Sequence, residues 1–313
     1  MSHHLFVRYN LIEHGFWKGC LLFMKLSESL RTHHLTLSFE VFPPKTDVGF
    51  SSVRDAALEI ASLSPLFMSV TYGAGGNGSK FTFGLCEEIE KASHVPTLAH
   101  LTCVNQTRDA IQRSLDELHT RGIHNIMALR GDIPDGDTHT GDFAHARDLI
   151  AYIKASSYDF CIGAACYPEI HPESLDRKDD IRFLKEKVDA GCDFLTTQMF
   201  FDNALLFHFL YRIREAGIQV PVFPGIMPIT SAKQVERALT LSHSFMPTRF
   251  KNLVDHFGTH PAAMKQAGIA YATDQIIDLY ASGIENIHVY TMNKPDVAAA
   301  ICHNVSDILG ASI

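Results

Sequence analysis

The sequence predicts an α/β protein built as a single (β/α)8 barrel, the TIM-barrel fold. Eight short apolar runs rich in β-branched residues recur along the chain, and amphipathic segments with helical spacing separate them. Eight strand–helix repeats in about 280 residues match the length and rhythm of this fold. The chain has 313 residues, of which 46% are hydrophobic, so one large domain can bury a substantial core.

The eight predicted strands are bounded by turn residues and alternate with predicted helices. The strands cover residues 35–42, 67–73, 95–103, 125–131, 160–167, 193–200, 220–227 and 286–292. Helical periodicity is clear in residues 49–63, 107–122 and 203–217, and the last two of these segments end in the glycine expected after a helix.

Polar side chains collect at the C-terminal ends of the predicted strands. In barrels of this kind, the C-terminal face carries the chemistry, so we expect the active site there. The residues are Glu40, Thr71, His100, Arg130, Asp132, Tyr167, His171 and Gln198.

The glycine-rich stretch 69–80, SVTYGAGGNGSK, offers a different interpretation. Gly73, Gly75 and Gly78 have the G-x-G-x-x-G spacing of a dinucleotide-binding Rossmann turn. That motif requires an acidic residue near the end of the next strand, and the predicted strand 95–103 ends without one. We therefore expect a loop whose glycines let the backbone approach a flat ligand closely.

Composition narrows the class of partner. The net charge is −8, and no block rich in Lys and Arg occurs, which argues against nucleic acid. No apolar run approaches the roughly 18 residues of a membrane span. The seven cysteines form no C-x-x-C pair, which indicates a reducing, cytoplasmic compartment. Small-molecule partners are expected.

The N-terminal segment, residues 1–23, has neither clean periodicity nor turn chemistry. Two interpretations stay open: an N-terminal extension packed on the surface, or a mis-assigned start with translation beginning at Met24. Met24 opens a helix-like stretch, MKLSESLRTHH. In either case, residues 24–313 are expected to form the single catalytic domain.

Glu40 is the first candidate catalytic residue. It lies between Phe39 and Val41, and Pro43 and Pro44 follow it. A carboxylate among apolar neighbours at a strand end should be partly desolvated, which raises its pKa and makes it a usable general acid near neutral pH. The alternative is a buried Glu paired with Arg or Lys.

Three further features are candidates for ligand binding, and two of them also have a purely structural explanation. Asp132 can bind an amidine-like edge, or form an Asx turn in GDIPDGD. Gln198 is an amide in an apolar run, and it must find partners. The predicted helix 177–189 places Asp180, Phe183 and Lys187 on one face, which could bind a ligand or be simply solvated.

Eight motifs occur in order from about residue 35 to the C-terminus: FEVFPPK, SVTYGAGG, HLTC, ALRGD, YPEIHPES, KVDAGCDFLTTQMFFD, PGIMPI and VYTMNKPDVAAAICH. Together they resemble the methylenetetrahydrofolate reductase family. The resemblance implies a barrel that contains FAD. NADH or NADPH reduces the flavin and leaves, and 5,10-methylenetetrahydrofolate is then reduced to 5-methyltetrahydrofolate in a ping-pong scheme.

The resemblance also implies a role for each matching residue. Glu40 would protonate the folate nitrogen at position ten, and Asp132 would bind the pterin and tune the flavin. Gln198, Gln234 and Lys294 would contact folate, and Gln198 also the nicotinamide. The implied cofactor-binding residues are Thr71, Tyr72, Ala74, His100, Arg130, Gly131, Asp132, Ala146, Tyr167, His171, Asp180 and Lys187.

Two positions depart from the family pattern. Phe183 stands where Asn is usual, so an apolar contact would replace one hydrogen bond to the flavin tail. Lys294 stands where Arg is common, which keeps the charge but loses the bidentate fork.

Two rival functions remain. One is a metal-dependent lyase or hydrolase with His100, His171, Glu169 and Asp132 as ligands, although their spacing matches no metal motif, and we expect no metal. The other is a non-catalytic homologue that binds flavin or folate, against which the presence of Glu40, Asp132 and Gln198 together counts. We also expect a homo-oligomer.

Overall fold

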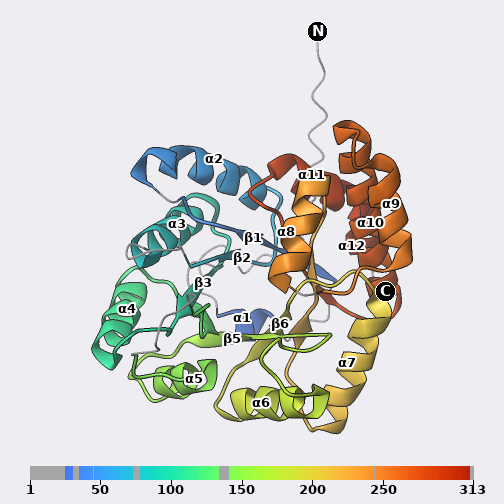
Figure 1. Ribbon diagram of the computed structural model, residues 1–313. Coiled ribbons are helices and arrows are strands. Elements are labelled where there is room, and N and C mark those ends of the chain that lie inside the picture. The colour runs from blue at the N-terminus through green and yellow to red at the C-terminus, as the bar shows by residue number, and fades with distance from the viewer. Residues whose placement is uncertain are drawn as a thin grey trace.

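The computed structural model describes residues 25–30, 35–44, 46–72, 78–133, 141–242 and 244–310. It shows parallel strands in a barrel with helices around the outside (Figure 1). The predicted fold class is confirmed. No helix in the described ranges is long and apolar enough to cross a membrane. Residues 1–24 lie outside them, so the choice between an extension and a start at Met24 stays a prediction.

The described strands form one sheet in the order β7-β6-β5-β4-β3-β2-β1-β9-β8, and neighbouring strands pair in parallel. This order is the succession expected when each strand is followed by a helix that returns the chain to the next position. The strands are β1 (Thr36–Val41), β2 (Met68–Val70), β3 (Thr97–Thr102), β4 (Asn125–Leu129), β5 (Cys161–Cys166), β6 (Phe194–Thr197), β7 (Val222–Phe223), β8 (Gly225–Ile226) and β9 (Asn286–Tyr290).

The barrel closes within the predicted strand 220–227, which is divided into β7 and β8 around Pro224. β7 pairs with β6, and β8 pairs with β9 on the other side. Proline has no N–H to donate, but its carbonyl accepts from His288 N (2.9 Å). The two short strands are thus one crossing segment that joins both ends of the sheet.

Helices cover the outside of the barrel (Figure 1). Side-chain oxygens cap several of them, such as Thr107 before α4 and Asp202 before α7, as the sequence pattern requires. The helices are α1 (Leu26–Ser29), α2 (Phe50–Ala61), α3 (Gly78–Ser93), α4 (Arg108–Thr120), α5 (Ala146–Lys154), α6 (Arg177–Asp189), α7 (Asn203–Glu215), α8 (Ala232–Ser242), α9 (Thr248–Phe257), α10 (Pro261–Ala281), α11 (Pro295–Asn304) and α12 (Ser306–Gly310); the 3-10 turn η2 (Asp47–Gly49) precedes α2.

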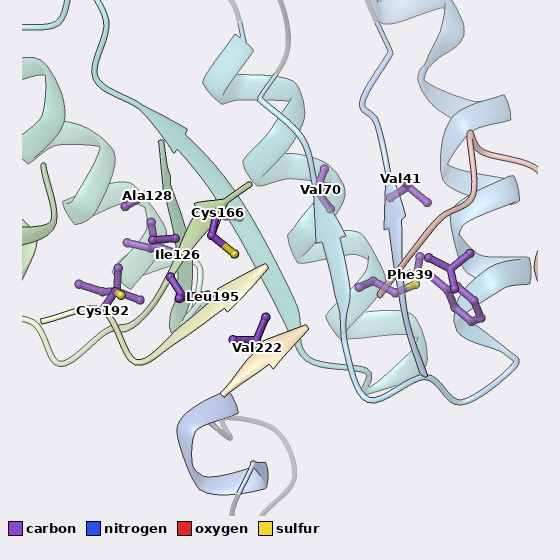
Figure 2. Packing of buried hydrophobic residues seen from close by; sticks show 14 of the residues in the cluster. Phe39, Val41, Val70, Ile126, Ala128, Cys166, Cys192, Leu195 and Val222 are labelled. Carbon is purple, nitrogen blue, oxygen red and sulfur yellow. The ribbon is translucent and has the colours of Figure 1, made fainter. Parts of the chain in front are cut away.

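The main hydrophobic core lies between the strands and the helices. Alternate strand residues such as Phe39, Val70 and Leu195 belong to it, and Figure 2 shows these side chains on the strands. Because successive strand residues point to opposite faces, the residues between them face the barrel interior.

A second core fills the inside of the barrel. Phe67, Phe194 and Phe223 meet there, and the rings of Phe67 and Phe223 lie 5.4 Å apart at 74°. Leu26 of α1 joins this cluster, and its backbone N–H donates to the Asn125 side chain (2.8 Å). The helix predicted from Met24 is thus only four residues long in the structure, and it packs against the interior cluster.

Glu90 in α3 is a half-buried carboxylate outside the barrel. It accepts from the backbone N–H (2.8 Å) and hydroxyl (2.7 Å) of Thr97. Burial outweighs these hydrogen bonds and raises the pKa of Glu90 to about 7. A carboxyl whose pKa is higher in the folded state costs stability as pH rises from its ordinary value to the raised one.

We predict that Glu90→Gln is more stable than the wild type above neutral pH, because the amide oxygen accepts the same hydrogen bonds without a charge. The difference in free energy of unfolding should grow from near zero at about pH 4 to about 3 kcal/mol at about pH 8. Urea denaturation at several pH values measures it. Glu88→Gln, at an exposed position of the same helix, is the control, and an equal pH dependence in both variants would contradict the prediction.

Candidate active site

A polar layer lies inside the barrel at strands β9, β1 and β2. Ser38 pairs in register with His288, and Glu40 pairs with Ser69 on one side and Tyr290 on the other. These residues alternate with the outward-facing apolar residues of the same strands, so strand periodicity places them in the interior. The chemistry-bearing groups of three strands therefore meet at one height of the barrel.

Glu40 makes its contacts with serine and histidine. The Ser69 hydroxyl donates to Glu40 Oε2 (3.1 Å), and His100 Nε2 and His288 Nε2 lie 3.5 and 3.8 Å from the same oxygen. Ser69 Oγ also lies 3.1 Å from His288 Nε2, and Ser38 Oγ lies 2.8 Å from His288 Nδ1. In the described ranges, Glu40 has no ion pair with Arg or Lys, so that alternative receives no support.

The predicted direction of the Glu40 pKa is wrong for this structure. Burial favours the protonated form, as expected, but hydrogen bonding to His288 and Ser69 and the charges of His100 and His288 outweigh it. The pKa of Glu40 therefore lies below its ordinary value. The expectation rested on Phe39 and Val41, whose side chains face the outer core instead.

A large cavity begins at His100 and extends over the C-terminal ends of β2 to β5 towards α6. Its volume is about 970 Å³. Eleven of the predicted cofactor-binding residues line it: Thr71, Tyr72, His100, Arg130, Gly131, Asp132, Ala146, Tyr167, His171, Asp180 and Lys187. Ala74 lies outside the described residues. The structure thus brings residues from separate strand ends and from α6 to one place.

Cationic side chains flank this cavity, among them Arg130 and Lys187. Arg130 donates to both carboxylate oxygens of Glu173, at 2.5 and 2.6 Å, and these hydrogen bonds lower the pKa of Glu173. Lys187 Nζ donates to the Ala165 carbonyl (2.7 Å), and burial lowers the pKa of the ammonium. The fixed positions of these cations make the cavity suitable for an anionic group.

The remaining walls combine aromatic and polar groups. Burial, reinforced by the charge of Asp132, raises the pKa of Tyr167 to about 12, and its ring meets that of His171 edge-on, with centroids 4.6 Å apart. Phe183 also lines the cavity and is 39% exposed. The face of α6 with Asp180, Phe183 and Lys187 is therefore the wall of a cavity and not a plain solvated face.

Of the predicted folate residues, Asp132 lines this cavity, whereas Gln198, Gln234 and Lys294 lie outside its lining. Gln234, in α8, accepts from the Thr230 N–H (3.0 Å), and Lys294, just before α11, donates to the Thr230 hydroxyl (2.7 Å). Gln198 follows β6, where its backbone N–H donates to Cys166 O (2.7 Å) and its side-chain oxygen accepts from Met199 N (2.9 Å). The structure thus brings Gln234 and Lys294 together through Thr230, and among the described residues no hydrogen bond joins Gln198 to that cluster.

Several residues of the site were missed from the sequence. Ser38, Ser69 and His288 surround Glu40, and Glu173 holds Arg130. The alternation of polar and apolar residues in the predicted strands 35–42, 67–73 and 286–292 could have identified the first three. No sequence signal pairs Glu173 with Arg130, because the contact joins two different loops.

The metal-dependent rival gains no support from the geometry. Its four ligands do not gather: the Glu169 carboxylate accepts from Phe245 N (2.9 Å), while His100 lies beside Glu40. Among the described residues, no group of three or more His, Cys, Asp or Glu side chains is arranged to hold a metal ion.

Comparison with known proteins decides the family. The family model described as methylenetetrahydrofolate reductase matches residues 25–306. The chain belongs to the methylenetetrahydrofolate reductase family. The family resemblance inferred from the eight motifs is confirmed.

The relatives in this family differ in length. A 5,10-methylenetetrahydrofolate reductase of Escherichia coli is 33% identical over 271 residues, which cover 87% of this chain and 90% of the relative. Methylenetetrahydrofolate reductase (NADH) 1 of Zea mays is 33% identical, and methylenetetrahydrofolate reductase 1 of Schizosaccharomyces pombe is 37% identical. The alignments cover 90% and 86% of this chain, but only 50% and 46% of those relatives, so the chain spans about half their length.

A solved structure from Clostridium thermocellum shares the fold. It is described as an uncharacterized protein that binds two copies of 5-methyl-5,6,7,8-tetrahydrofolic acid. The TM-score is 0.64, with 92% of this chain and 99% of that chain covered. At 13% sequence identity, the likeness concerns the barrel architecture alone.

We predict that Gly131→Ala destabilises the protein more than Gly283→Ala does. Both glycines have positive φ, at 90° and 84°, so both variants should lose about 1 kcal/mol to backbone strain. A Cβ at Gly131 would lie 2.8 Å from Val104 Cγ1, whereas a Cβ at Gly283 meets nothing within 4 Å. The overlap should cost Gly131→Ala about 1–3 kcal/mol more, measured by urea denaturation. Equal losses of stability in the two variants would contradict the prediction, because they would show that Val104 moves aside at no cost.

Proposed function

We propose that this protein reduces 5,10-methylenetetrahydrofolate to 5-methyltetrahydrofolate with electrons from NADH or NADPH, through bound FAD, in a ping-pong order. The observation that carries the proposal is the position of His100. It lines the large cavity, and its Nε2 lies 3.5 Å from Glu40. The side chain of His100 therefore links a cofactor-sized cavity to Glu40, the proposed proton donor.

The residues around the cavity fit FAD. The volume of about 970 Å³ is at the upper end for ligand pockets, as a dinucleotide-sized group requires. His100 Nε2 is buried without a hydrogen-bond partner in the described ranges, which a ligand atom would relieve. Arg130 and Lys187 suit the pyrophosphate, and Phe183 offers an apolar contact to the cofactor tail.

When bound, FAD would supply hydride transfer, from the nicotinamide in one half-reaction and to folate in the other. Tyr72 and Gly131 would lie against it, and Asp132 would accept hydrogen bonds from the amino and ring N–H groups of the pterin. Gln198, Gln234 and Lys294 would orient folate. The NADH named in the Zea mays relative and the 5,10-methylenetetrahydrofolate named in the Escherichia coli relative support these substrates.

Glu40 would deliver the proton that opens the five-membered ring of the substrate at nitrogen ten. In the described structure, neighbouring donors favour its carboxylate form. Ligands that fill the cavity would expel water and increase the desolvation that favours the protonated form. The Ser69 hydroxyl donates a hydrogen bond to the carboxyl, and the Nε2 atoms of His100 and His288 lie within 4 Å of it, so these two imidazoles are the nearest groups that could supply its proton.

The state of the cysteines bears on the compartment in which the enzyme works. The six cysteines in the described ranges are free thiols, which suits a reducing compartment such as the cytoplasm. Assembly into a homo-oligomer stays a prediction.

We predict that Lys187→Met purifies with much less flavin than the wild type, because it removes a half-buried cation from the cavity wall. The loss of one charge-assisted contact should weaken flavin binding at least about tenfold. Released flavin is quantified by absorbance and mass. Lys185→Met, which changes a lysine of the same helix paired with Asp189, is the matched control. Equal flavin content in both variants would refute a role for Lys187, and FMN in place of FAD would refute the cofactor assignment.

We predict that Glu40→Gln separates the two half-reactions. Flavin reduction by the nicotinamide needs no general acid, so it should change little. Reoxidation by methylenetetrahydrofolate needs a proton that an amide cannot deliver, so it should slow by about 10² to 10⁴-fold. Stopped-flow absorbance of the flavin measures each step separately.

The variant is nearly isosteric, so flavin content should match the wild type, and the protein should stay folded at the assay temperature. If both steps slow equally, Glu40 has a structural or binding role. If neither slows, the proton comes from another group, and Asp132→Asn is the next variant to measure.

A further inference from the structure

Thr230 lies at the centre of a hydrogen-bonded cluster beyond the large cavity. It belongs to the loop between β8 and α8, and only 7% of its surface is exposed. Its hydroxyl oxygen lies 2.7 Å from Lys294 Nζ and 3.1 Å from Gln234 Oε1, and its backbone N–H donates to the same Oε1 (3.0 Å). One threonine thus contacts two side chains from different elements.

The chemistry of these groups sets the direction of each hydrogen bond. An ammonium can only donate, so Thr230 Oγ1 accepts from Lys294. The hydroxyl proton is then available for the Gln234 side chain, which also faces the Thr230 N–H. Two donors require an acceptor between them, so the Gln234 atom facing Thr230 is its oxygen. The amide nitrogen of Gln234 therefore faces away from Thr230.

The groups of this cluster that are left for a ligand are therefore all hydrogen-bond donors. The N–H groups of Gln234 Nε2 and the remaining hydrogens of Lys294 Nζ have no partner among the residues that the structure describes. Both side chains are half-buried. A half-buried pair of donors with one positive charge suits a ligand group that is rich in acceptors, such as a carbonyl or carboxylate.

The backbone holds Thr230 and Lys294 in place. A Cβ at Gly268 of α10 would overlap the Ile229 carbonyl oxygen, so α10 packs directly on the loop that carries Thr230. On the other side, the Thr291 hydroxyl donates to the Glu40 carbonyl (2.7 Å), which ties the loop of Lys294 to the strand of Glu40.

The two residues before Lys294 strengthen this link. Met292 and Asn293 both have positive φ, at 55° and 54°, although neither is glycine. The Asn293 side chain exchanges two hydrogen bonds of 2.9 Å with the Phe42 backbone, which holds the strained turn. The backbone of Lys294 is therefore held in place relative to the strand of Glu40.

From this geometry we propose that Thr230 is a positioning residue for the substrate. Its hydroxyl holds Gln234 and Lys294 as a pair of donors for the carbonyl or carboxylate oxygens of folate, at a set distance from Glu40. The inference rests on the proposed function and deepens it. Thr230 acts through its two neighbours and takes no part in the chemistry.

The test compares Thr230→Val, which removes the hydroxyl, with Thr230→Ser, which keeps it. Tetrahydrofolate lacks the bridging carbon and cannot accept hydride, so calorimetric titration with it measures binding alone. Thr230→Val should bind tetrahydrofolate about tenfold or more weakly, and the folate concentration for half-maximal flavin reoxidation should rise by the same factor. The limiting reoxidation rate and flavin reduction by NADH should stay within about twofold.

Thr230→Ser should restore binding to within about threefold of the wild type. Thr240→Val is the matched control, because within the part of the chain that the structure describes the Thr240 hydroxyl bonds only the Glu236 carbonyl of the same helix, α8. In a Lys294→Met background, Thr230→Val should weaken tetrahydrofolate binding much less than it does alone, since the two residues act together.

Three results would overturn the proposal. Thr230→Val could bind tetrahydrofolate as the wild type does. Thr230→Ser could fail to restore binding. The rates of both half-reactions could decrease together in Thr230→Val. If the wild type binds tetrahydrofolate and Thr230→Val binds it equally well, only the role of Thr230 is refuted. Wild-type protein that binds no folate removes the proposed function together with it.

Discussion

The register of β1 against β2 and β9 is the constraint on which the rest of the site depends. It sets Glu40 opposite Ser69 and Ser38 opposite His288 inside the barrel. Because strand side chains alternate with a period of two, a slip of one residue would turn Glu40 towards the helices and Phe39 towards the interior. The apolar residues that pack under the helices therefore also orient the polar residues of the site.

The interior of the barrel is divided into an aromatic part and a polar part, and His288 joins them. Its ring stacks on Phe67 at 5.5 Å, while its two nitrogens face Ser38 and Ser69. The aromatic cluster thus holds an imidazole in a fixed orientation beside Glu40. A carboxylate with this many donors nearby is stabilised at rest, and a change in hydration or ligand occupancy can shift its proton.

Glu40 also connects two regions that the chain builds separately. On one side, His100 leads into the large cavity with its cations and aromatic rings. On the other, the Glu40 carbonyl holds the loop that carries Lys294. The strand that supplies the carboxyl thus fixes the distance between a cofactor-sized space and a cluster of hydrogen-bond donors. This suits a reaction in which two partners must approach one group in turn.

The sequence by itself determined the strand–helix order, most strand and helix positions, the face that carries the polar residues, and the family. These follow from periodicity, capping and motifs, which act over a few residues. The tertiary structure decided three matters. Closure of the barrel divides the predicted strand 220–227 at Pro224, because its two halves pair with different neighbours. The helix predicted from Met24 is shortened to α1. The pKa of Glu40 is lowered and not raised, because its partners are Ser69, His100 and His288, whereas the sequence shows only Phe39 and Val41 beside it. Local sequence sets which face a side chain takes, but only the register between distant strands decides what it meets there.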